Sequence, residues 1–156
     1  MKTPALLPPV LIGAVASARS MTPMAALAGA HLAGRETPGR LRLLGHPLFT
    51  AGALFMGVGE LLGDKMKSAP DRTVPLGLLA RVMSAGIAGA ALAPRGRERA
   101  GALAAVLTAG PLAYVTLAAR KKAMLRMGQT RSGLIEDVLI VAAGTAVVAW
   151  MVHGRR

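Results

Sequence analysis

Residues 100–119 read AGALAAVLTAGPLAYVTLAA, a run of twenty residues without a charged side chain. An apolar helix of about 20 residues is long enough to cross the hydrocarbon core of a lipid bilayer. Charged segments flank the run on both sides, at 94–99 and 120–131. This run therefore predicts a membrane-spanning helix, and it decides the class of fold.

The composition of the whole chain agrees with this assignment. Of the 156 residues, 53% are hydrophobic, 17% are charged and 3% are aromatic, and the mean hydropathy is +0.50. A soluble core with so few aromatic residues would lack its largest side chains. Helices in lipid instead associate through small residues, such as the 19 glycines of this chain. We predict a single transmembrane domain over residues 1–156.

Four further apolar runs have the character of membrane segments. They comprise residues 4–34, 46–63, 75–93 and 133–152. Short polar or basic segments separate them, as loops separate the spans of a polytopic membrane protein. The runs together predict an all-α transmembrane bundle of about five or six helices.

The first run is interrupted near its middle by Arg19, Ser20, Thr22 and Pro23. Proline lacks a backbone N–H, and neighbouring polar side chains can satisfy the carbonyl groups that it leaves without a partner. The pattern predicts a helix broken near Arg19 to Pro23, either as two stacked halves or as a re-entrant hairpin.

The net charge of +12 lies mainly in short Lys and Arg clusters between the apolar runs, and we interpret 120–131 as the longest basic loop. Each such residue beside anionic lipid headgroups contributes on the order of 1 kcal/mol of attraction. No basic face carries stacking aromatics, so we expect no nucleic-acid partner. If the first run crosses once, nine Lys and Arg residues face one side and eight the other, so their distribution indicates no orientation.

Ionisable residues within or beside the apolar runs are the candidate functional residues. Each would cost about 2.5–3.5 kcal/mol at a helix centre in lipid, so we expect them to face the bundle interior and to pair. Glu60 and Asp64 lie four residues apart, on one helical face. The predicted path for a substrate or ion consists of Arg19, Glu60, Asp64, Arg81, Arg131, Glu136 and Asp137.

Each of these assignments has a structural alternative. Asp64 can lie among headgroups beside Lys65, and Arg81 can extend to the interface or form a structural ion pair. Glu136 and Asp137 can stabilise the positive end of a helix dipole, although Glu136 lies about one turn inside its run. The three histidines lie at run ends without partners at ligand spacing, and the chain has no cysteine. We therefore predict no cofactor and no metal.

Three segments together resemble a bacterial membrane-protein family catalogued as the domain of unknown function numbered forty-one twenty-six. They are residues 18–23 (ARSMTP), 60–65 (ELLGDK) with the loop 70–73 (PDRT), and 131–137 (RSGLIED). The resemblance implies a helical protein of the bacterial cytoplasmic membrane, with a break in the first helix and an acidic residue in the last. It implies no particular activity.

Two shorter segments resemble other families. Residues 60–65 are similar to the Glu-x-Gly-Asp-Lys signature of small cation exchangers, but two residues separate Glu60 from Gly63 and Met66 replaces a hydroxyl residue. Residues 130–133 (TRSG) resemble the phosphate loop of polyprenyl-pyrophosphate phosphatases, which implies that Arg131 and a helix N-terminus hold a phosphate. Arg-Ser occurs at both 19–20 and 131–132, so an internal repeat with Arg19 and Arg131 at a shared polar centre is a further hypothesis.

The cost of interior charges in lipid favours a small transporter or permease-like protein whose charged residues couple protons or ions. A homodimer is expected, because so few helices enclose little volume. One alternative is hydrolysis of a lipid-linked phosphate, with Glu60 as base, although other catalytic groups at reaction spacing are missing. Another is a structural or assembly role, in which the charges fix the register of the helices. The expected substrate is a small ion or a small molecule.

Overall fold

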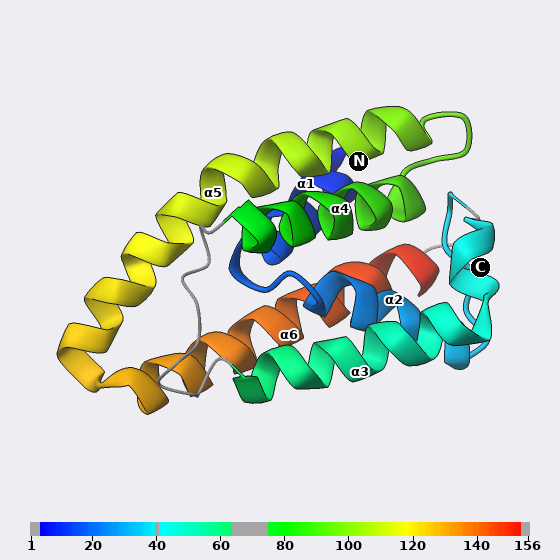
Figure 1. Cartoon of the computed structure of the whole chain (residues 1–156). Coiled ribbons are helices and arrows are strands. Elements are labelled where there is room, and N and C mark those ends of the chain that lie inside the picture. Colours follow the sequence, from blue (N-terminus) through cyan, green and yellow to red (C-terminus); the bar gives the residue numbers. More distant parts are fainter. Residues whose placement is uncertain (1–3, 40, 64–74, 154–156) are drawn as a thin grey trace.

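The computed structural model describes residues 4–39, 41–63 and 75–153. Within them it contains six α-helices, one short 3-10 helix and no strand, which confirms the predicted all-α bundle (Figure 1). The helices are α1 (Leu7–Ala18), α2 (Thr22–Leu32), α3 (Pro47–Gly63), α4 (Pro75–Leu92), α5 (Glu98–Met127) and α6 (Gln129–His153), and the 3-10 helix η1 (Arg42–Gly45) precedes α3.

The distribution of side chains is that of a membrane protein. Helices α4, α5 and α6 are each long and apolar enough to cross a membrane. Small residues fill the core, where Ala88 and Ala105 are fully buried, while Phe55 and Leu125 are more than 80% exposed on the outside. Large apolar groups on the surface suit lipid and not water. The chain is therefore a helical membrane protein.

The first apolar run is broken where the sequence predicts it. Helix α1 ends at Ala18 and α2 begins at Thr22. With 12 and 11 residues, the two helices are about 18 and 16 Å long at 1.5 Å per residue, so neither alone crosses a hydrocarbon core of about 30 Å. They are half-helices.

The two half-helices form a re-entrant hairpin. Gly39, shortly after α2, donates its N–H to the carbonyl of Ala91, so α2 finishes where α4 ends and α5 begins. Gly13 of α1 packs against Ala105 near the start of α5, whereas the Ser17 carbonyl accepts a hydrogen bond from Thr116, farther along α5. Helix α1 therefore runs away from this end of the bundle and α2 returns to it. We call it the loop end, formed by residues 33–39, 41–46 and 93–97.

This topology predicts which introduced cysteines share a side of the membrane. Ala5 and Ala33 are exposed at the two outer ends of the hairpin, Arg97 is exposed at the loop end, and Lys122 lies near the other end of α5. We expect cysteine at positions 5, 33 and 97 to react with a membrane-impermeant maleimide from one side of sealed vesicles, and cysteine at 122 from the other. The cysteine-free chain provides the background. Labelling of positions 5 and 33 from opposite sides would contradict the hairpin.

Glycines bring the helices of the bundle into backbone contact. A Cβ atom added at Gly89 of α4 would lie 2.4 Å from the Gly101 carbonyl oxygen of α5, so this crossing admits no side chain. Helix α3 approaches α2 through Gly57, where an added Cβ would lie 2.8 Å from that of Ala25. The sequence pattern favoured Gly59 with Gly63, but a Cβ at Gly59 would meet nothing within 4 Å.

The prediction of a basic loop over residues 120–131 is wrong. Helix α5 continues to Met127, α6 begins at Gln129, and Gly128 joins them with a φ angle of 80°. Only glycine adopts such a left-handed conformation readily, which explains why the helix ends there. The charged residues of this segment therefore have fixed positions on helices, and Arg120 is directed into the bundle.

Candidate functional site

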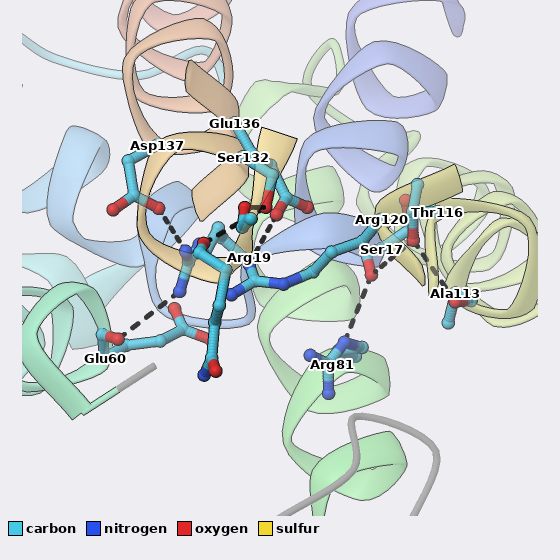
Figure 2. Close-up of polar contacts among 12 residues, drawn as sticks. Ser17, Arg19, Glu60, Arg81, Ala113, Thr116, Arg120, Ser132, Glu136 and Asp137 are labelled. Atoms are coloured by element: carbon cyan, nitrogen blue, oxygen red, sulfur yellow. Dashed lines mark hydrogen bonds and ion pairs between the residues drawn. The ribbon is translucent and has the colours of Figure 1, made fainter. Parts of the chain in front are cut away.

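Six charged side chains of the described residues gather around the break between α1 and α2 (Figure 2). The break supplies one arginine, and α3, α4, α5 and α6 supply the others. Three are arginines and three are carboxylates, so their formal charges balance. We call this set the charged cluster: Arg19, Glu60, Arg81, Arg120, Glu136 and Asp137.

Arg19 lies at the centre of the cluster and is 1% exposed. It directly follows α1, where a cation complements the negative end of the helix dipole. Its Nη2 forms an ion pair with Asp137 of α6, and its Nη1 donates to the backbone carbonyl of Glu60 at 3.3 Å. One guanidinium group thus links the hairpin tip to both α3 and α6.

Glu60 binds the start of α2. Its Oε1 accepts hydrogen bonds from the Ser20 N–H at 2.8 Å and the Ser20 hydroxyl at 2.7 Å, and its Oε2 accepts from the Met21 N–H at 2.8 Å. These backbone donors precede Thr22, so they have no partner within the helix. No ion pair to the Glu60 carboxylate occurs among the described residues. Its charge is stabilised by the positive end of a half-helix instead.

The end of α1 is held from the opposite side by α4 and α5. The carbonyl of Ser17 accepts hydrogen bonds from Arg81 Nε at 3.1 Å and from the Thr116 hydroxyl at 3.2 Å. Arg81 Nη1 also donates to Gly77 one turn back along α4, at 2.8 Å. A buried carbonyl at a helix end needs such donors, because no following turn supplies them.

A second ion pair joins the two longest helices. Arg120 Nη1 of α5 lies 2.5 Å from Glu136 Oε2 of α6, and both side chains are mostly buried. An added Cβ at Gly133 would lie 3.5 Å from Arg120 Nη2, so the absence of a side chain there leaves room for the guanidinium group. The pair therefore links α5 to α6 near the break between α1 and α2.

The structure brings together most, but not all, of the predicted residues. Arg19, Glu60, Arg81, Glu136 and Asp137 meet in the cluster, whereas Asp64 lies outside the described residues. Arg131 is exposed on α6 while Arg19 is buried, so these two do not share a polar centre. The segment 130–133 forms part of the helix and not a loop before it, and the Ser132 hydroxyl donates to Gly128 at 2.8 Å.

Sequence reasoning missed Arg120, Ser20 and Thr116. The predicted path contains three arginines and four carboxylates, and this excess of carboxylates was the available sign that a further arginine enters the interior. Arg120 follows directly after an uncharged run, and the assumed loop placed it in the headgroups. Ser20 contributes through its backbone N–H as well as its hydroxyl, and no residue type identifies such a role.

Comparison with known proteins gives no match for this chain, whether with family models, curated proteins or solved structures.

The other potential ligand groups lie apart from the cluster. His31, His46 and His153 are exposed at or beside the loop end. Within the described residues, no three His, Asp or Glu side chains form a group that could hold a metal ion. Four cavities with volumes between about 210 and 510 Å³ open between the helices, and no member of the charged cluster lines any of these four. The largest begins at Thr22, beside the hairpin tip.

Proposed function

We propose that this chain is a small transporter or permease-like membrane protein in which protonation or ion binding at Glu60 controls the position of the α1–α2 hairpin. The observation that carries the proposal is the hydrogen bonding of the Glu60 carboxylate to the first backbone donors of α2. Discontinuous helices whose ends meet charged groups inside the membrane are a recurring way to build transport sites.

The ionised state of Glu60 determines whether the hairpin tip is held. An ionised carboxylate only accepts hydrogen bonds, and two of the three donors that reach Glu60 are backbone N–H groups, which can only donate. A protonated carboxyl group carries its own O–H among these donors and loses its attraction to the helix dipole. Protonation therefore weakens the attachment of α2 to α3, while the Arg19–Asp137 pair still holds the other side of the tip.

Proton flux in liposomes tests the proposal. Purified protein would be reconstituted around a pH-sensitive dye, and flux would be driven by a membrane potential and by Na⁺, K⁺ or Mg²⁺ gradients. We expect the wild type to move protons and Glu60→Gln to fall to the rate of protein-free vesicles, because the amide cannot take up a proton. Glu98→Gln is the matched control, since Glu98 caps a surface turn at the loop end and should leave the flux unchanged.

Two outcomes would count against transport. One is a folded Glu60→Gln variant that moves protons as fast as the wild type. The other is a wild type that moves no protons under any of these gradients. The second outcome would favour a structural role, which is supported by the buried ion pairs and by the four cavities that do not reach the cluster.

The predicted homodimer and the bacterial cytoplasmic membrane belong to this proposal. The outer face of α3 offers a surface for a second copy: Phe55 and Leu62 are exposed there, and added Cβ atoms at Gly52 and Gly59 would meet nothing within 4 Å. Close helix contact in lipid uses such small residues. Cross-linking of a Gly59→Cys variant in membranes would detect the dimer.

A further inference from the structure

Two cavities at the loop end share one arginine. The larger, of about 510 Å³, lies between α2, α3 and α6, and its lining is mostly Ala, Gly, Val and Leu. It extends along α2 from Thr22 and reaches Arg35 beyond the end of the helix, and we call it the tail cavity. The smaller, of about 210 Å³, is lined by His31, Arg35, Glu36 and Arg42 together with residues of η1, and we call it the head cavity. Arg35 belongs to both.

The head cavity has the chemistry of an anion site. The side chains of Arg35 and Arg42 make no hydrogen bond or ion pair with any residue that the structure describes. Guanidinium groups bind phosphate through paired N–H donors, and they are less strongly hydrated than an ammonium group. Two arginines face a single carboxylate there, that of Glu36. The excess positive charge favours an anionic group at the level of the lipid headgroups.

The tail cavity has the dimensions and lining for an apolar chain. It follows all eleven residues of α2, from Thr22 to Leu32, a length of about 16 Å at 1.5 Å per residue, and continues to Ala33. Its polar side chains are few and lie mainly at its ends, with Thr22 at the inner end and Arg35 and His153 at the outer end. Such a lining suits a hydrocarbon chain, with a charged group placed at the outer end beside Arg35.

A third cavity, of about 340 Å³, offers space for a second hydrocarbon chain. It lies between the end of α2 and the start of α3, and it shares His31 and Gly45 with the head cavity and Leu54 with the tail cavity. Its remaining lining, including Leu32, Pro47 and Ala51, is largely apolar. Two apolar cavities therefore join one cationic cavity at the same end of the bundle.

We propose that the head cavity, the tail cavity and the third cavity together bind one anionic phospholipid. Its phosphate lies at Arg35 and Arg42, one acyl chain occupies the tail cavity and the other occupies the third cavity. The site is independent of the proposed transport function, because it uses no member of the charged cluster. It nevertheless reaches the hairpin tip at Thr22, so a bound lipid would contact the hairpin.

Native mass spectrometry of delipidated protein tests this site. The protein would be titrated with phosphatidylglycerol, phosphatidylcholine or oleate. We expect one tightly bound phosphatidylglycerol, preferred over phosphatidylcholine by roughly tenfold, which corresponds to about 1.4 kcal/mol. The double substitution Arg35→Gln and Arg42→Gln should abolish the preference. Arg97→Gln with Arg99→Gln, two exposed arginines that line none of the four cavities, should retain it.

A cavity-filling variant provides a second test that does not remove charge. An added Cβ at Gly29 of the tail cavity would meet nothing within 4 Å, so Gly29→Leu should fold and block the acyl chain. Gly110→Leu, equally open and outside these cavities, is its control. Equal binding of phosphatidylglycerol and phosphatidylcholine to the wild type, or equal binding by Gly29→Leu and Gly110→Leu, would overturn the proposal. So would complete displacement of phosphatidylglycerol by equimolar oleate, because that would assign the site to a single chain.

Discussion

Replacing Arg19 by glutamine is expected to lower the free energy of unfolding by about 3–5 kcal/mol, because it leaves the buried Asp137 carboxylate without its cation. The loss also removes the guanidinium donor to the Glu60 carbonyl. Unfolding of the purified protein in mixed detergent and SDS micelles, followed by circular dichroism, would measure the change. Arg131→Gln is the matched control, since this arginine is exposed on α6 and its removal should change stability by less than about 0.5 kcal/mol.

A second substitution separates loss of the pair from loss of the arginine itself. If the uncompensated charge dominates, Arg19→Gln combined with Asp137→Asn should recover a large part of the stability lost in Arg19→Gln alone. A double variant no more stable than the single one would show that the Asp137 charge is not the cause.

A charge-exchange variant, with Arg19→Asp and Asp137→Arg together, tests whether this ion pair is structural or belongs to the coupling site. A purely structural pair should tolerate exchange better than a coupling site, because exchange restores the attraction but reverses the charges at the hairpin tip. A stable, folded exchange variant without flux would support transport, whereas one with wild-type flux would remove this pair from the coupling site.

Gly101→Ala is expected to destabilise the bundle by about 3 kcal/mol, the upper part of the range for overpacking a close contact. The new methyl group would lie 2.4 Å from the Ala93 Cβ and 2.5 Å from the Gly89 carbonyl oxygen, and the backbone of α4 would have to move away. The same unfolding assay would measure the effect.

Gly110→Ala on the same helix is the control for this substitution. A Cβ there would meet nothing within 4 Å, and alanine favours a helix over glycine by roughly 0.5–1 kcal/mol. The two variants should therefore change stability in opposite directions. Equal effects at both positions would mean that helix propensity, and not the contact between α4 and α5, controls the result.

The helical bundle could be predicted from the sequence because lipid imposes strong requirements on composition. Long uncharged runs such as 100–119 have few interpretations, and the polar interruption at Arg19 and Pro23 marked the break correctly. The direction of α2 after the break could not be predicted. It depends on contacts such as that of Gly39 with Ala91, between residues more than fifty positions apart.

The sequence predicted which residues would form the candidate site better than it predicted which of them would bind one another. The cost of charge in lipid identified Arg19, Glu60 and Arg81 without any structure. It could not say that Glu60 would bind backbone N–H groups while Asp137 paired with Arg19, since either carboxylate satisfies the same electrostatic requirement. Arg120 was missed because an arginine after an apolar run suits a helix and a loop equally well.

The ion pair between Arg19 and Asp137 joins residues 118 positions apart in the chain. During synthesis α1 and α2 therefore leave the ribosome long before α6, which carries Asp137. Each half-helix is too short to cross the bilayer alone, and Arg19 has no pair with Asp137 until α6 has been made. The pair between the hairpin tip and α6 can therefore form only after α6 has been made, so the hairpin reaches its native position late in assembly although it is translated before α6.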